Sequence, residues 1–123
     1  MIKNMPDSEE YDRLVYKIIP TCDWEAACVA GVYTGSADDQ RDGYIHFSTR
    51  EQVRGTLARH FAGQDNLLLL AVVANDLDSS ALKYETSRRG EKFPHLYGNL
   101  FPSAVEARYM IHLTEAGEHS VEF

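Results

Sequence analysis

The sequence has little that would link the chain covalently or bind a structural metal. It contains four prolines and only two cysteines, Cys22 and Cys28. These lie six positions apart in what reads as a short helix, so their side chains would point to nearly opposite sides and are poorly placed to pair. Their spacing matches no zinc motif, and no group of histidines lies nearby. We therefore expect two reduced thiols, as in a cytoplasmic protein.

Long apolar runs are also absent. The longest, LLLLAVVA at 67–74, is far shorter than the roughly 20 residues that a membrane-spanning helix needs. The first ten residues are polar and include Asp7, Glu9 and Glu10, where a signal peptide would need an apolar segment. We expect a cytoplasmic protein that does not associate with membranes.

Basic residues are in the minority, with 12 Lys and Arg against 19 Asp and Glu and a net charge of −7. Because general nucleic-acid binding depends on neutralising phosphates, this balance argues against it. One segment is an exception. The run KYETSRRGEK at 83–92 holds four basic and two acidic side chains, and we call it the basic island.

What the sequence does contain fits one folded domain. Hydrophobic residues make up 44% of it, and seven Tyr, five Phe and one Trp can anchor a packed core. A length of 123 residues corresponds to a single domain. We predict a disordered N-terminal lead over residues 1–12 and one domain over residues 13–123.

Hydrophobic periodicity predicts more strands than helices. We expect strands at 14–20, 44–49, 67–74, 82–86 and 104–113. We expect loops at 87–101 and at 34–43, where the loop could contain one helical turn. The pattern predicts a compact α+β domain in which two or three helices pack on a mostly antiparallel β-sheet.

Two helices have recognisable start signals. One is expected within the segment TCDWEAACVAG, with Thr21 or Asp23 as its N-cap and Gly31 just past its end. The other follows residue 49, because Ser48 and Thr49 each have a Glu or Gln three residues on, as in a capping box.

Three segments carry polar residues that core packing does not explain. The first is IHFST at 45–49, where a strand meets a helix. A helix N-terminus receives anions and hydroxyls well, and His46, two residues before Ser48, could exchange a proton with a ligand hydroxyl. The alternative is that Ser48 or Thr49 only caps the helix, while His46 fills a half-buried sheet position.

The second segment is the basic island, where Arg88 could hold a phosphate or carboxylate with its forked pair of donors. The alternative is a solvated loop. The third is FPHLYG at 93–98, in which His95 and Tyr97 alternate and can project the same way. A Tyr beside a His can stack on a flat ring and form hydrogen bonds at its rim. The alternative is that the two aromatic side chains close a loop over the core.

Other chemistries find less support. His46, Glu85 and His95 could together ligate a divalent ion, but no pair has the close spacing of a zinc site, so we predict no metal site. The sequence has no G-x-S-x-G elbow, P-loop or dinucleotide fingerprint. His60 is expected to be a packing residue at the boundary of its helix.

The blocks YKIIP, DGYIHFST, FAGQDNLLLLAV and LKYETSRRGEKFPHLYG together resemble a bacterial family of short proteins classed as a domain of unknown function, DUF952. The resemblance covers residues 15–100. It implies a remote relationship to the ADP-ribosyltransferase fold, in which NAD is held in a cleft of a split β-sheet.

The resemblance also implies roles for particular residues. His46 would contact the ribose and the nicotinamide amide, with Ser48 and Thr49 as polar companions. Either Tyr84 or Tyr97 would stack on the nicotinamide. The third motif is usually a Glu at the start of a late strand. Glu106 has a suitable position without the surrounding motif, and Glu85 is the better-supported carboxylate.

We therefore hypothesise a small cytoplasmic protein that binds NAD or another ADP-ribose-containing nucleotide in a cleft lined by His46, Glu85, Arg88 and His95. If it is an enzyme, His46 orients the ribose and Glu85 stabilises the positive charge that develops at the anomeric carbon. The predicted ligand-binding residues are Ser48, Thr49, Tyr84, Ser87, Arg88, His95 and Tyr97. One alternative is a non-enzymatic interaction or regulatory module; a third hypothesis is a metal-assisted hydrolase.

Overall fold

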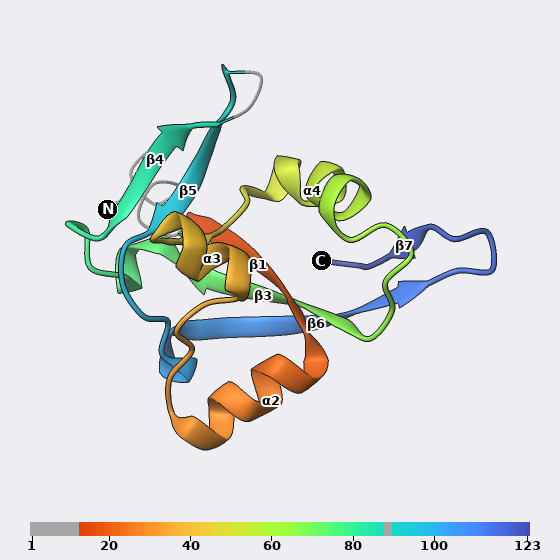
Figure 1. Cartoon of the computed structure of the whole chain (residues 1–123), viewed down its shortest axis with the longest axis horizontal. Coiled ribbons are helices and arrows are strands. Elements are labelled where there is room, and N and C mark those ends of the chain that lie inside the picture. The colour runs from red at the N-terminus through yellow and green to blue at the C-terminus, as the bar shows by residue number, and fades with distance from the viewer. Residues whose placement is uncertain (1–12, 88–89) are drawn as a thin grey trace, which may run out of the picture.

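The computed structural model describes residues 13–87 and 90–123, which form an α+β domain (Figure 1). The expected N-terminal lead and Arg88 both lie outside the described residues. The strands are β1 (Leu14–Pro20), β2 (Ile45–His46), β3 (Leu67–Val73), β4 (Leu82–Thr86), β5 (Lys92–Leu96), β6 (Val105–Leu113) and β7 (His119–Ser120). The α-helices are α2 (Thr21–Ala30), α3 (Ala37–Asp42) and α4 (Val53–His60), and short 3₁₀ turns include η1 (Arg50–Gln52).

The larger sheet has the strand order β1-β3-β6-β7, and every pairing in it is antiparallel. Its centre is β3, whose sequence LLLLAVV is apolar on both faces and buried over its first six residues. Figure 1 shows α2 on one side of this sheet and α4 on the other. A strand that is covered on both faces needs a continuous apolar run, which is why β3 does not alternate.

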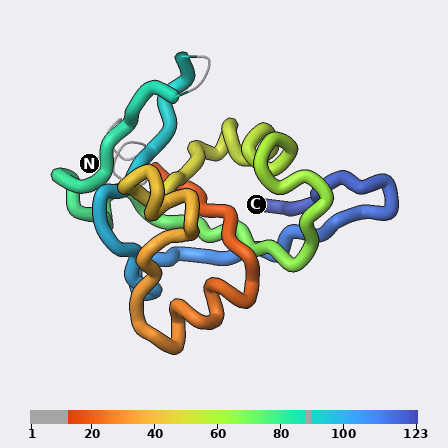
Figure 2. The backbone as a smooth tube through the Cα atoms, in the orientation of Figure 1, coloured from red at the N-terminus to blue at the C-terminus, as the bar shows by residue number. Residues whose placement is uncertain are grey.

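Two hydrophobic cores lie on the two faces of the larger sheet. Alternate residues of β1 divide between them, because successive side chains of a strand point to opposite faces. Val15 and Ile19 join the core that contains Trp24 of α2, whereas Tyr16 and Ile18 join the core that contains Leu57 of α4. The C-terminal segment folds back toward α4 (Figure 2), and the members of the second core include Val121 and Phe123.

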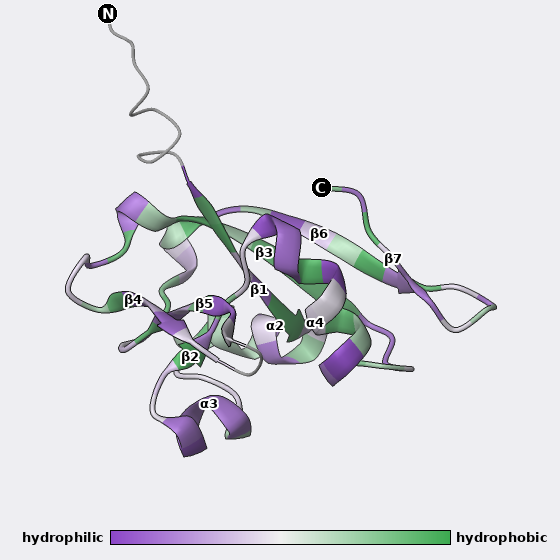
Figure 3. Cartoon of the chain, turned by 90° about the horizontal axis from the view of Figure 1, so that it is seen from above, coloured by the Kyte–Doolittle hydropathy of each residue, from purple (hydrophilic) through white to green (hydrophobic). Residues whose placement is uncertain are grey.

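The smaller sheet has the order β2-β5-β4 and is also antiparallel. Its pairings put apolar side chains on one face, among them Ile45 opposite Leu96. The other face carries the cross-strand pair His46 and His95. The apolar face closes the first core, and the polar face is left for the cleft described below. In Figure 3, α3 is largely hydrophilic and lies at the periphery beside this sheet.

The strands predicted at 14–20, 82–86 and 104–113 are confirmed, as is the buried strand at 67–74. The predicted strand at 44–49 is shorter. Only Ile45–His46 is a strand, and Ser48 forms an isolated bridge with Tyr16 of β1 instead. The backbone of this segment therefore connects the two sheets, because Phe47 N donates to the carbonyl of Pro94 and Ser48 N to that of Tyr16.

The prediction of a loop at 87–101 was wrong for Lys92–Leu96, which form β5. Pro94 lacks an N–H, and proline is unusual inside a strand, but its carbonyl accepts from Phe47 and the neighbouring residues pair with β2 and β4. The acidic loop contains the six-residue helix α3, which Ser36 caps. Neither Thr21 nor Asp23 caps α2, because Pro20 is at the N-cap without a side-chain hydrogen bond. The capping box predicted from Thr49 and Gln52 is confirmed.

Neither cysteine is in a disulfide, and both are exposed. Across the part of the chain that the structure describes, no helix combines the length and the apolar character needed to cross a membrane.

Candidate functional site

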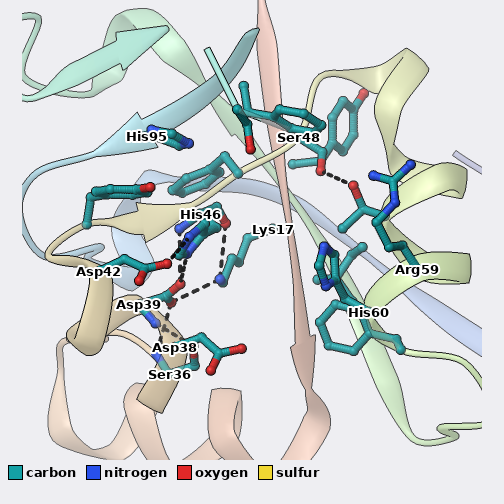
Figure 4. Close-up of a pocket in the computed structure, with 18 of the residues that line it drawn as sticks. Lys17, Ser36, Asp38, Asp39, Asp42, His46, Ser48, Arg59, His60 and His95 are labelled. Carbon is teal, nitrogen blue, oxygen red and sulfur yellow. Dashed lines mark hydrogen bonds and ion pairs between the residues drawn. The ribbon is translucent and has the colours of Figure 1, made fainter. Parts of the chain in front are cut away.

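A cavity of about 300 Å³ lies between two walls. One wall is formed by α3 and the polar face of the small sheet, and the other by α4. We call this cavity the cleft. Figure 4 shows Asp38, Asp39 and Asp42 on one wall, and Arg59 and His60 of α4 on the opposite wall. Lys17 of β1 lies between the two walls. β1 connects the two walls, because Lys17 reaches Asp39 of α3 while Tyr16 and Ile18 pack in the core beneath α4.

Asp39 is the buried centre of the acidic wall, with 2% of its surface exposed. Its Oδ2 accepts hydrogen bonds from Lys17 Nζ at 3.0 Å and from Ser36 N at 2.9 Å. Its Oδ1 lies 2.6 Å from His46 Nδ1 and 3.1 Å from His46 N. The local cause is a capping box, since Ser36 and Asp39 bond reciprocally at the start of α3 and turn the carboxylate inward.

The charges around Asp39 keep it ionised. Burial alone would raise the pKa of the Asp39 carboxyl, but the hydrogen bond from His46, the charge of Lys17 and the Ser36 amide outweigh burial and hold the pKa below its usual range. Burial lowers the pKa of Lys17, and the neighbouring Asp39 opposes that shift. Because an ionised carboxylate can only accept, His46 must carry its proton on Nδ1.

The second nitrogen of His46 faces another carboxylate. Its Nε2 lies 3.0 Å from Asp42 Oδ2, and 38% of the His46 side chain is exposed to the cleft. An imidazole that carries both protons can donate to Asp39 and Asp42 at once. Two partners fix the plane of the ring, so His46 presents one defined edge to anything that binds in the cleft.

His95 is held in a similar way on the neighbouring strand. Its Nδ1 lies 2.8 Å from Glu85 Oε1, and the hydroxyl of Tyr97 donates to the same oxygen at 2.7 Å. These hydrogen bonds, first from His95 and then from Tyr97, lower the pKa of Glu85. The bond to Glu85 raises the pKa of Tyr97 to about 12, so this phenol remains a donor at neutral pH.

Tyr44 joins the two histidines. Its ring stacks on His95 with centroids 3.9 Å apart and planes 20° apart, and its centroid is 4.7 Å from that of His46. Tyr97 lies beside it at 5.2 Å. The four rings form an aromatic cluster at one end of the cleft, with a carboxylate behind each histidine.

The α4 wall differs in character. Thr56, Arg59 and His60 occur at helical spacing on one face of α4, whereas Val53 and Leu57 turn into the core. Ser48 extends this wall, since its Oγ lies 3.0 Å from Thr56 Oγ1. His60 was expected to be a packing residue; it is exposed and lines the cleft instead.

The structure brings together most of the predicted site residues. His46 and His95 have ring centroids 5.7 Å apart, and Glu85 binds His95. Ser48 and Ser87 line the cleft, and Tyr97 joins the cluster through Glu85. Whether these residues bind a ligand stays a prediction.

Two of the predicted ligand-binding residues, Thr49 and Tyr84, lie away from the cleft, as does the carboxylate candidate Glu106; Glu85 and Tyr97 do not line it but bind beside His95. Thr49 caps the turn η1. Tyr84 pairs with Pro94, on the face of the small sheet opposite His95, and packs against the first core. Its buried hydroxyl has no hydrogen-bond partner among residues 13–87 and 90–123. Tyr97 is therefore the better candidate of the two tyrosines. Glu106 is exposed on β6 and does not line the cleft.

Four cleft residues were not predicted from the sequence: Lys17, Asp39, Tyr44 and Arg59. Lys17 left a signal, because it is the single charged residue in the apolar strand LVYKIIP. Asp39 left none, because it lies within a run of acidic and polar residues that is typical of a solvated loop. As for metals, no group of three or more His, Cys, Asp or Glu side chains comes together as a binding site within the described ranges.

Comparison with known proteins places the chain in a family. A search of curated proteins gave no match. The X-ray structure of protein CC0527 from Caulobacter crescentus is 45% identical, with a TM-score of 0.82 over 87% of this chain and 93% of that one. Its solution NMR structure is 46% identical, with a TM-score of 0.77 over 85% and 90% of the two chains. The profile of the family described as "Protein of unknown function (DUF952)" matches residues 18–108, and the chain therefore belongs to the DUF952 family.

Proposed function

We propose that the protein binds a nucleotide of the NAD or ADP-ribose class in the cleft. The observation that carries the proposal is the cross-strand pair His46 and His95, each oriented by a carboxylate and both in contact with Tyr44. Burying charged and polar groups costs solvation free energy that apolar side chains in the same places would not cost. Such an arrangement is expected where a ligand must be oriented.

The chemistry of the cleft matches a ring joined to a sugar. A nicotinamide or adenine ring can stack on aromatic surface such as that of Tyr44 and of Tyr97, which is 42% exposed. A ribose hydroxyl both donates and accepts, and the edge formed by His46 Nε2 and Asp42 Oδ2 offers both partners. The cavity volume of about 300 Å³ is at the lower end of the range for ligand sites.

The remote relationship to ADP-ribosyltransferases that the family resemblance implies favours NAD over other ligands that carry a ring and a sugar, because His46 would correspond to the ribose-binding histidine. A catalytic role for Glu85 has less support. Its Oε1 is engaged by His95 and Tyr97, and Glu85 does not itself line the cleft. In this proposal Glu85 orients His95.

A thermal-shift screen with NAD, ADP-ribose, adenosine and AMP tests the proposal. A ligand present at a hundred times its dissociation constant should add about 2.7 kcal/mol to the apparent stability. We expect the shift in wild type and a much smaller one in His46→Ala. His112→Ala is the matched control, because His112 is exposed on β6 and does not line the cleft. The proposal fails if none of these compounds shifts wild type, or if His46→Ala responds as His112→Ala does.

A further inference from the structure

The charges that line the cleft are compensated unequally. Lys17 is paired with Asp39, and Arg41 is paired with both Asp38 and Asp42. Arg59 is different: its side chain makes no ion pair or hydrogen bond with a residue in the described ranges. Of the two arginines that line the cleft, Arg59 is therefore the one whose positive charge has no carboxylate partner among the described residues.

Hydroxyl groups lie on the same wall as Arg59. Thr56 precedes it by three residues on α4, so the two side chains share one face of the helix. Thr56 Oγ1 is 3.0 Å from Ser48 Oγ, and either oxygen can be the donor. Whichever hydroxyl donates, the other keeps a proton that can be donated to a ligand. Ser48 is buried, so its position is fixed by the fold.

The opposite wall is unfavourable for an anion, because it is rich in carboxylates. Its carboxylates include Asp39 and Asp42, and its arginine, Arg41, is already bonded to Asp38 and Asp42. Figure 4 shows this acidic wall facing Arg59 across the cleft. A ligand with one anionic end and one hydroxyl-bearing end therefore has a single favourable orientation.

We propose that Ser48, Thr56 and Arg59 form a phosphate subsite on the α4 wall. It takes the phosphate of a nucleotide whose ribose lies toward His46 and Asp42 and whose ring lies toward the aromatic cluster. This inference rests on the proposed function and deepens it. Because the cavity is small, the subsite selects one nucleotide unit, and the second unit of a dinucleotide extends outside the cleft.

Calorimetric titration with matched pairs of ligands tests the subsite. The pairs are AMP with adenosine, and nicotinamide mononucleotide with nicotinamide riboside, each titrated into wild type, Arg59→Ala, Arg59→Lys and Arg108→Ala. Arg108 is exposed on β6 and does not line the cleft, so its variant reproduces the charge change alone. Circular dichroism and thermal unfolding establish that each variant is folded.

We expect Arg59→Ala to weaken both monophosphates about ten- to a hundred-fold, as for loss of a charge-assisted contact, and to leave the nucleosides nearly unchanged. Arg59→Lys should recover only part of the loss, because an ammonium lacks the guanidinium fork. Equal losses in Arg59→Ala and Arg108→Ala, or nucleosides that bind wild type as tightly as their monophosphates, overturn the subsite while the proposed function stands.

A titration with inorganic phosphate, followed by backbone amide chemical shifts, separates the two proposals. Shifts at Thr56 and Arg59 that disappear in Arg59→Ala support the subsite even if no nucleotide or nucleoside binds, and the proposed nucleotide function then fails alone. An absence of nucleotide binding together with no such shifts overturns both.

Discussion

Four hydrogen-bond donors converge on the carboxylate of one residue, Asp39, and they come from three separate parts of the chain. The Lys17 ammonium reaches it from β1, the Ser36 amide from the start of α3, and His46 from β2. Asp39 therefore fixes three elements of the cleft at one point. Its role is to position His46, and its removal would leave Lys17 as a buried charge without its partner.

At this scale we predict that Asp39→Asn destabilises the fold by about 3–5 kcal/mol, because the buried Lys17 loses its counter-charge. Urea unfolding followed by circular dichroism gives the free energy of unfolding. Asp42→Asn is the control, since 32% of the Asp42 side chain is exposed against 2% of that of Asp39, and its loss should cost much less. The double variant Lys17→Met, Asp39→Asn should be more stable than Asp39→Asn alone. A double variant no more stable than the single one would show that the buried charge is not the cause.

The position of α3 is constrained at its start. Gly35, just before its N-cap, has a φ of +111°, and a Cβ added there would lie 2.8 Å from the Cβ of Asp39. No side chain fits this approach, and backbone with positive φ is strained in any residue other than glycine. The glycine therefore lets the chain turn tightly enough to bury Asp39.

We predict opposite effects of Gly→Ala at two positions. Gly35→Ala should lower the free energy of unfolding by about 1–3 kcal/mol, because it adds strain and a contact with Asp39. Gly55→Ala, within α4, should raise it by about 0.5–1 kcal/mol, because nothing lies within 4 Å of the added methyl and alanine favours the helix. Thermal and urea unfolding of both variants measure this. A neutral Gly35→Ala would show that α3 can shift away from the small sheet without cost.

The strands and helices differ in how far the sequence could predict them. Strands β1, β3 and β6 were predictable because each has a local pattern that packing then uses. The strand β5 was not, because Pro94 is tolerated there only through contacts with β2 and β4, which no local pattern records. Helix α3 depends on a capping box within a run of acidic residues, and such runs are more often loops.

The same distinction holds for the candidate site. His46, Glu85 and His95 were predictable because they are polar residues in segments that core packing leaves unexplained. The Lys17–Asp39 pair was not, because the two residues are 22 positions apart and meet only when α3 packs over β1. The uncompensated charge of Arg59 likewise becomes visible only when the partners of the other cleft arginine are known.

For the whole molecule, these interactions make stability depend on pH in a defined direction. Asp39, Asp42, Asp78 and Glu85 all have a pKa below the usual range in the folded protein. In the unfolded chain, Asp and Glu titrate near their ordinary values of about 3.9 and 4.3. Between the two values the unfolded state binds more protons, so the free energy of unfolding rises with pH there. Stability from these groups is complete above about pH 5 and is lost as the pH falls through the folded-state pKa values.

We therefore predict that wild type loses stability steeply below about pH 4, and that Asp39→Asn, which lacks the titration of its buried carboxyl, loses it less steeply. Urea unfolding at pH 7, 5, 4 and 3 gives the two curves, and the gap between them should narrow as the pH falls. Asp78→Asn is the control for an exposed carboxylate, because Asp78 is stabilised only by Ser80 at the surface, and its curve should stay close to that of wild type.

Parallel curves for wild type and Asp39→Asn from pH 7 to pH 3 would mean that the Asp39 carboxyl has the same pKa in the folded and unfolded chains. The bonds from Lys17, Ser36 and His46 would then only offset the cost of burying its charge and would provide no net stabilisation.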